Sequence, residues 1–305
     1  MITNLHFLWK LKNYFCRMIY LIIGIACNVL LLLILRSFQK FNVPSFPAIV
    51  VNYFVAGSFS LLFTTPKTIY FEATHLWFPA FCLGALFISI FYLISQTTVK
   101  MGVSVASVAN KMSVVIPVLL AFVIYNDTPH WLKIIGILIA LTSVFLVSSS
   151  NTKNQTSFDK KKFLLPLLVF LGSGIIDALV NYAQKKVVHN TIETACFSGL
   201  SFYSAGVIGL IILLFFNKEK NTDYKKTILA GIILGTPNYF SIYFIMKAID
   251  SNIMQSSVLY PIVNVSVVLG STLCAYLFFA EKLSVKNIIG ITLSILAIFC
   301  IAFSN

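Results

Sequence analysis

The chain has 305 residues, of which 59% are hydrophobic and only 10% are charged, and its mean hydropathy is +0.93. These values exclude a water-soluble globular domain of ordinary composition, so the sequence predicts an integral membrane protein. The formal net charge of +13 at pH 7 would suit a nucleic-acid-binding protein, but the lysines gather in connections beside apolar runs, where they anchor and orient membrane helices. Nucleic acid is therefore not an expected partner.

Ten apolar runs, separated by short polar stretches, are each about long enough to cross a bilayer as a helix. Strands of a membrane barrel are shorter and alternate apolar with polar residues, so an all-α fold with ten transmembrane helices is the better interpretation. In chain order, the expected spans are 18–35, 46–64, 76–98, 103–125, 132–149, 163–183, 195–216, 227–246, 253–279 and 287–303. Met18 opens the first span and is an alternative start to Met1.

The second half of the chain repeats the first. Asn110 aligns with Asn264 and Asp127 with Glu281 at a shift of 154 positions. Upstream, Gln39 aligns with Gln184 at 145, Gly57 with Gly206 at 149, and Gly84 with Gly235 at 151, as expected if residues were inserted in the connections. The expected organisation is an N-terminal extension (1–17), a first five-helix repeat (18–150), a polar linker (151–162) and a second five-helix repeat (163–305).

Five crossings per repeat is an odd number, so the second copy enters the bilayer from the opposite face. Two such copies are related by a two-fold axis in the membrane plane, which is the inverted-repeat architecture of many secondary transporters. The fold expected from the sequence is thus ten transmembrane helices arranged as two inverted five-helix repeats.

In both copies a span of small and polar residues is followed by an acidic residue and a glycine in the next span: Asp127 and Gly136 in the first copy, Glu281 and Gly290 in the second. With Pro117 and Pro261 in the preceding spans, the pattern resembles the EamA-type transporters of the drug/metabolite transporter superfamily, over residues 18–303. The resemblance implies a cavity between the repeats and the export of small metabolites or drugs. It also implies a location in the bacterial cytoplasmic membrane.

Two lines of evidence on membrane orientation disagree. Odd-numbered connections carry thirteen lysines and arginines, whereas the other side of the membrane, with the N-terminal segment, carries eight. By the positive-inside rule this difference places both termini outside the cytoplasm. The family resemblance instead implies cytoplasmic termini, and the sequence leaves both orientations open.

Two ionisable residues lie deep inside predicted spans. Burying such a group at the bilayer centre costs about 2.5–3.5 kcal/mol on insertion scales, so Asp177 and Lys111 are expected to face a cavity or each other. A structural ion pair between the fourth and sixth spans is the alternative. As a carrier residue, Asp177 would bind and release a coupling proton, and Lys111 would tune that step or bind an anionic group.

Other polar side chains in the spans complete the predicted substrate site. Asn181 lies one turn from Asp177, and further amides and tyrosines lie on the fourth, eighth and ninth spans. Lone amides in membrane helices often only join neighbouring helices, so packing is the alternative role for each. The full set of predicted substrate-binding residues is Asn110, Lys111, Asp177, Asn181, Asn238, Tyr243, Tyr260 and Asn264.

Pro117 and Pro261 are predicted to break their helices, because a proline removes a backbone donor inside a span. Asp127 and Glu281, at span junctions, are expected to be caps for the helices that follow or interfacial anchors. The four histidines show no metal-ligand spacing, so neither a metal site nor a cofactor is expected.

The leading prediction is a secondary carrier of a small molecule in the lipid bilayer that works by alternating access. Amino acids, other metabolites and drugs all remain admissible substrates, and the oligomeric state is open. The alternative is a membrane-embedded enzyme or flippase acting on a lipid-linked substrate. An enzyme of this kind would require paired carboxylates, a Ser/His pair or clustered metal ligands, and the sequence shows no such cluster.

Overall fold

The computed structural model describes residues 2–61, 74–116, 119, 131–148, 160–189, 191–216, 223–250 and 256–303. Within these ranges every regular element is helical. The helices are α1 (Ile2–Lys40), α2 (Ser45–Ser60), the 3-10 helix η3 (Thr74–Leu76), α3 (Trp77–Met101), α4 (Val103–Met112), α6 (Trp131–Ser148), α7 (Lys160–Lys186), α8 (Thr191–Phe216), α9 (Tyr224–Asp250), α10 (Ser256–Phe279) and α11 (Val285–Ala302).

Each of the ten predicted spans corresponds to one of these α-helices. In the described residues, four segments are long and apolar enough to cross a membrane by length and composition: Met18–Lys40, Thr74–Met101, Glu193–Phe215 and Tyr224–Ile245. Five other apolar helices are shorter. The fourth span differs most from the prediction, because α4 ends at Met112 although the apolar run continues toward residue 125.

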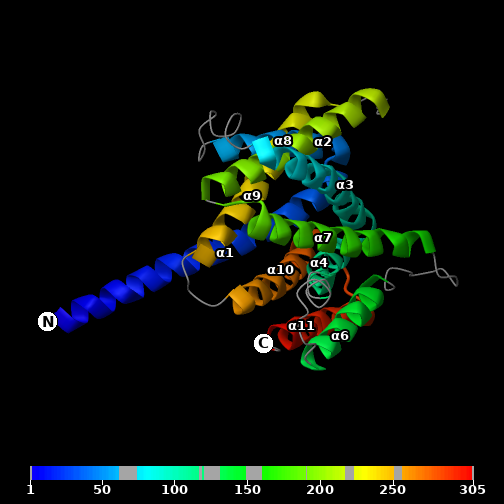
Figure 1. Ribbon diagram of the computed structural model, residues 1–305. Helices are drawn as coiled ribbons and strands as arrows, with labels where there is room; N and C mark the ends of the chain where they lie inside the picture. Colours follow the sequence, from blue (N-terminus) through cyan, green and yellow to red (C-terminus); the bar gives the residue numbers. More distant parts are fainter. Residues whose placement is uncertain are drawn as a thin grey trace.

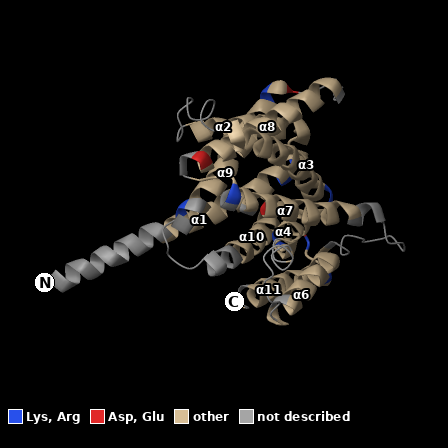
Figure 2. Cartoon of the chain, in the orientation of Figure 1, with Lys and Arg blue, Asp and Glu red and all other residues tan. Residues whose placement is uncertain are grey.

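The outer faces of the helices are apolar. Leu214, Phe215 and Phe278 are 71–76% exposed, and many other leucines, isoleucines and phenylalanines on α6, α8, α9 and α11 are exposed as well. Figure 2 shows few lysine, arginine, aspartate or glutamate residues along the helices. Apolar side chains exposed in this number would be unfavourable in water but match the acyl chains of a lipid bilayer.

The helices pack in two groups joined by a central layer. At one end of the molecule α2 lies between α8 and α9, and at the other end α6 packs along α11; α4, α7 and α10 lie between these groups (Figure 1). The largest buried apolar cluster is formed mainly by α1, α2, α3, α8 and α9, and a second one by α4, α6, α10 and α11. The central layer therefore connects two separately packed cores.

Helices α2 and α8 run antiparallel and make a reciprocal set of contacts. A methyl group built on Gly57 would lie 3.1 Å from the Tyr203 ring, and one built on Gly206 would lie 3.2 Å from the Phe54 ring. At a shift of 149 positions Gly57 corresponds to Gly206 and Phe54 to Tyr203. Exchanging each residue for its repeat mate therefore turns one contact into the other.

The same reciprocity holds where α6 meets α11. Gly136 faces Ile301 of α11, and Gly290 faces Val147 of α6. A shift of 154 positions relates Gly136 to Gly290 and Val147 to Ile301. The α3–α8 pair corresponds in the same way to the α9–α2 pair. Gly84 of α3 lies against Ser201 of α8, and their repeat mates, Gly235 of α9 and Asn52 of α2, lie against each other.

Candidate functional site

A cavity of about 220 Å³ lies where the first-half helices α1–α4 meet the second-half helices α7–α9. Its polar lining consists of Asn28, Asn110, Ser173, Asp177, Asn238, Ser241 and Tyr53, and its apolar lining of Leu31, Phe87, Ile90, Phe91, Ile94, Ile176, Phe202 and Ile242. Ligand sites for drug-sized molecules usually measure about 300–1,000 Å³. The size and composition fit a small amphipathic molecule.

Most polar groups of this cavity already have a protein partner. The Asn28 amide donates to the Gly24 carbonyl (3.0 Å), Tyr53 Oη to the Phe87 carbonyl (2.8 Å), and Nδ2 of Asn238 to Oδ1 of Asn52 (3.0 Å). The Ser173 hydroxyl differs, because it is buried in the cavity wall and makes no hydrogen bond in the structure. An unpaired buried hydroxyl is costly, so Ser173 is available to a bound molecule.

The carboxylate of Asp177, on α7, is accessible from the cavity that it lines. The Ser113 hydroxyl lies 3.3 Å from its Oδ2, and the Lys111 ammonium interacts with it electrostatically. Both residues come from the end of α4, so the helices of the fourth and sixth predicted spans meet here. A carboxylate held near one cation and one hydroxyl can bind a proton or a protonated amine without entering lipid.

The early end of α4 places Ser113 in this contact. Ser113 caps the helix, its hydroxyl lies 2.5 Å from the Asn110 carbonyl, and its own carbonyl accepts from Ile116 in a tighter turn. In an uninterrupted helix that carbonyl would accept from residue 117, but Pro117 has no N–H to donate. Pro117 itself lies outside the described residues, so the predicted break at Pro117 stays a prediction; α4 ends at Met112, before it.

Aromatic rings form one wall of the cavity. The Tyr53 and Phe87 rings stack with their centroids 6.5 Å apart, and the Phe87 and Phe202 rings with theirs 5.7 Å apart. Phe91 meets the Tyr53 ring edge-on at 5.8 Å. This wall, contributed by α2, α3 and α8, gives the site an apolar face opposite the polar side chains of α7 and α9.

The structure brings together three of the eight predicted substrate-binding residues in the cavity lining, namely Asn110, Asp177 and Asn238. Lys111 is adjacent through its interaction with Asp177. Tyr243 and Asn264 lie elsewhere: Tyr243 stacks on Tyr239 and under the Lys247 ammonium, and Asn264 is half-buried on α10. The side chains of Asn181 and Tyr260 are outside the described part of the chain.

Two prolines of the second half, Pro261 and Pro237, lie within helices. Helix α10 is continuous from Ser256 to Phe279, so the structure describes no interruption at Pro261. Pro237, which the sequence analysis did not single out, lies inside α9 immediately before Asn238. It removes the donor for the Ile233 carbonyl directly beside the cavity lining.

Glu281 caps a helix, but not the one that follows it, and this corrects the expectation from the sequence. Its Oε2 accepts the Val103 N–H of α4 at 3.1 Å, whereas α11 is capped by Ser284, whose hydroxyl accepts the Asn287 N–H. A methyl group on Gly102, whose φ is +103°, would overlap the Glu281 carboxylate. The close approach therefore requires glycine at this turn. Asp127 lies outside the described residues.

Arg36 completes this junction from α1. Its guanidinium donates to the carbonyls of Thr98 and Val99 at the end of α3, so a cation lies at the negative end of α3 and an anion at the positive end of α4. Burial raises the pKa of Glu281, while the Val103 N–H and the Arg36 charge act in the opposite direction. The junction links α1, the α3–α4 turn and the α10–α11 connection.

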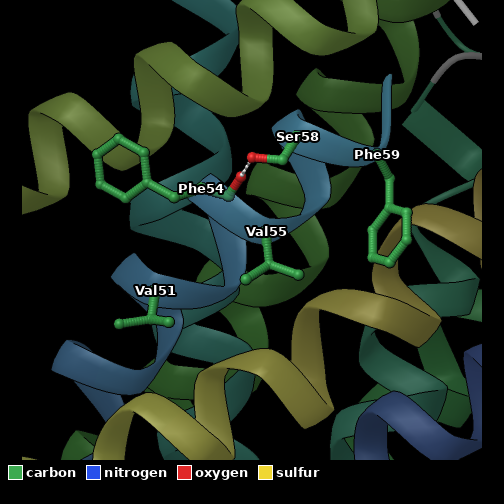
Figure 3. Close-up of a pocket in the computed structure, with 5 residues that line it drawn as sticks. All are labelled: Val51, Phe54, Val55, Ser58 and Phe59. Carbon is green, nitrogen blue, oxygen red and sulfur yellow. Dashed lines mark hydrogen bonds between the residues drawn. The ribbon is translucent and has the colours of Figure 1, made fainter. Parts of the chain in front are cut away.

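A second, more open groove of about 540 Å³ runs along one face of α2 (Figure 3). It is lined by Val51, Phe54, Val55, Ser58 and Phe59, and the Ser58 hydroxyl is satisfied by the Phe54 carbonyl at 2.8 Å. None of these five lining residues is ionisable. The smaller central cavity, with its carboxylate and unpaired hydroxyl, is the better candidate site.

Comparison with known proteins matches the EamA-like transporter family twice, over residues 17–149 and 164–303. The chain belongs to the EamA-like transporter family. This EamA-like protein is therefore an integral membrane protein of a transporter family, as the sequence resemblance implied. It is 28% identical over 289 residues to an uncharacterized protein of Haemophilus influenzae, a match that covers 93% of this chain and 97% of the relative.

Among solved structures, a crystal structure with 14% sequence identity matches this EamA-like fold with a TM-score of 0.57. The match covers 92% of this chain and 95% of the other. At this level of identity the similarity concerns the fold alone.

Proposed function

We propose that this protein is a secondary carrier for a small amphipathic metabolite, in which two inverted five-helix repeats alternately open the central cavity to the two faces of the membrane. The observation that carries the proposal is the position of Asp177, the carboxylate of the cavity, at the seam between helices of the two halves. A carrier needs such a site at the interface of its moving parts.

The reciprocal helix contacts support the inverted repeat. In the α2–α8 and α6–α11 pairs, a residue of one helix contacts the repeat mate of a residue that contacts its own mate in return. Contacts of this reciprocal kind are expected between two copies related by a two-fold axis. The packing of α1 on α10 and of α7 on α4 forms another corresponding pair. Two copies related in this way can exchange conformations, so that the opening passes from one face to the other.

The cavity lining supports a site on the same axis. Several lining residues are repeat mates: at a shift of 145 positions Asn28 corresponds to Ser173 and Leu31 to Ile176, at 149 Tyr53 to Phe202, and at 151 Phe87 to Asn238, Ile90 to Ser241 and Phe91 to Ile242. Asp177 breaks the symmetry, because its mate is Leu32. The carboxylate is the acidic group among the described lining residues, and we assign it the binding of a proton or of a protonated amine.

The decisive experiment uses purified protein in proteoliposomes with a panel of amines, amino acids and other small metabolites, with and without a pH gradient. The wild type is expected to accumulate one class of compound against its gradient when a pH gradient is imposed. Asp177→Asn is expected to lose this accumulation. If that variant still exchanges substrate across the membrane, Asp177 couples protons; if exchange is lost as well, it binds the substrate.

Wild-type kinetics in a correctly folded Asp177→Asn variant would remove Asp177 from the mechanism. Asn28→Ala serves as a matched control, since it removes a polar group of the same cavity without changing its charge. The direction of physiological transport, which we take to be export, follows from which side of oriented vesicles shows uptake.

A further inference from the structure

A cluster of metal-ligand side chains lies away from the cavity, where α3 and α8 begin. His75 comes from η3, His189 from the connection between α7 and α8, and Glu193 from the first turn of α8. One ligand atom from each lies within 4.8 Å of the others, and His75 Nε2 is 3.8 Å from Glu193 Oε2. The histidine spacing predicted no metal site, because His75 and His189 lie 114 positions apart in the chain.

The cluster rests on a rigid base and is open to water. Beneath it, Leu76, Ala80, Ala183 and Phe197 belong to a small buried core formed by α3, α7 and α8. Above it, the His75 side chain is 44% exposed, and the Glu193 side chain is 18% exposed. An ion in solution can thus reach side chains whose backbones are fixed by packing.

Backbone contacts orient the carboxylate of this cluster. Glu193 Oε2 accepts the His189 N–H at 2.8 Å, which fixes the start of α8 and the position of the carboxylate. The His75 and His189 rings lie face to face with their centroids 6.1 Å apart. Without an ion, the same arrangement is a carboxylate that caps α8 beside two imidazoles, and zinc titration distinguishes this capping role from a metal site.

The ligand chemistry favours zinc among common divalent ions. Two imidazoles and one carboxylate form a known ligand set for Zn²⁺, with water at the fourth position and bond lengths of about 2.0–2.2 Å. Ligand atoms around such an ion lie roughly 3.3 Å apart in a tetrahedral arrangement. Side-chain rotations that shorten the distances between these atoms, now within 4.8 Å, by up to about 1.5 Å would give that spacing. Ca²⁺ and Mg²⁺ prefer oxygen ligands, and this cluster offers one carboxylate.

We propose that His75, His189 and Glu193 form a zinc site that joins the start of α3, in the first half, to the start of α8, in the second half. Occupancy by zinc fixes these two helix ends against each other at one end of the bundle. The site stands on its own geometry and does not depend on the carrier function.

The test uses the full-length protein in detergent, treated with chelator and then titrated with ZnCl₂. We expect one zinc per chain by elemental analysis and a saturable rise in the melting temperature, with no response to MgCl₂ or CaCl₂. His75→Ala is expected to weaken zinc binding by at least about tenfold. Because His75 is exposed and caps no helix, this variant should melt at the wild-type temperature when zinc is absent.

Two controls exclude other zinc ligands. Cys82→Ser removes an exposed thiol, and Asp223→Asn removes an exposed carboxylate at another helix start; both should bind zinc as the wild type does. Failure of the wild type to bind zinc, or unchanged zinc affinity in both His75→Ala and His189→Ala, would overturn the proposal.

Discussion

Asp177 acquires its role from residues that lie on another helix. Its carboxylate is accessible from the cavity because α7 presents it, with Ser173 one turn earlier, toward α3 and α9. Ser113 and Lys111 reach it because α4 ends at Met112. These contacts stabilise the charged group, and in the carrier proposed above it would exchange its partner for a proton or a substrate.

At the same scale, Glu281 predicts a pH effect on stability. Burial raises the pKa of Glu281 in the folded protein above its usual value of 4.5. The folded state therefore holds this proton more tightly, so the stabilising contribution is full below pH 4.5 and is lost as the pH rises through the raised pKa. The melting temperature of the wild type should show this loss, and that of Glu281→Gln should not.

The glutamine variant keeps an oxygen that can accept the Val103 N–H, whereas Glu281→Ala leaves that N–H without its partner and should cost about 1–3 kcal/mol. Lys282→Gln, at the exposed neighbouring position, is the matched control. An identical pH profile for the wild type and Glu281→Gln would show that the carboxyl group does not titrate differently on unfolding.

Among the helices, close packing depends on glycines in corresponding positions. A methyl group on Gly84 would lie 2.7–2.8 Å from the Ser201 carbonyl oxygen and the Ala205 nitrogen of α8. On Gly235 it would lie 2.8 Å from the Asn52 carbonyl oxygen of α2. Since the backbone of the facing helix cannot rotate away as a side chain can, the two helix pairs have almost no room for a larger residue.

Gly84→Ala and Gly235→Ala should therefore each destabilise the protein by about 1–3 kcal/mol, as overpacked cores do. We expect both variants to melt earlier than the wild type in the same detergent, by similar amounts. Gly270→Ala is the control, because its methyl group would meet only the Val29 side chain at 3.1 Å. That variant should be neutral or slightly more stable, since alanine favours helix.

The helices were predictable because lipid requires long apolar segments: the described residues form an α-helix at each of the ten predicted spans, and four segments are long and apolar enough to cross a membrane. The end of α4 was not, since hydropathy continues unchanged past Ser113. Asp177 was predictable as an ionisable residue in an apolar run. Ser173 was not, because a serine between two glycines suggests only close packing. Glu281 was assigned to the wrong helix, since its partner Val103 is 178 positions away.

For the whole molecule, the antiparallel contacts predict which connections share a side of the membrane. Helix α3 has 25 residues, or about 37 Å at 1.5 Å per residue, so its two ends lie near opposite surfaces. Glu281 contacts the α3–α4 turn at one end. His189 lies beside His75 at the other end. The connection holding Asn42 belongs to the Glu281 side, because Arg36 of α1 contacts Thr98 there.

Single-cysteine variants in a background free of native cysteines test this arrangement. Asn42→Cys and Lys282→Cys should react with a membrane-impermeant maleimide from one side of intact cells, and Thr74→Cys from the other. The side on which Asn42→Cys reacts also decides between the two orientations, because the positive-inside rule assigns that surface to the cytoplasm. Labelling of all three variants from one side would contradict the inverted repeat.

The unequal distribution of charge in a near-symmetric cavity has a kinetic consequence. Since Leu32 occupies the position equivalent to Asp177, the carrier proposed above would hold a cationic cargo on the same half of the protein whichever surface the opening faces. Release of the cargo from Asp177 would then follow a different path to one compartment than to the other. Half-saturation concentrations measured from the two sides of oriented vesicles should consequently differ, and the maximal rates should differ in the same proportion, so that net movement still requires a gradient.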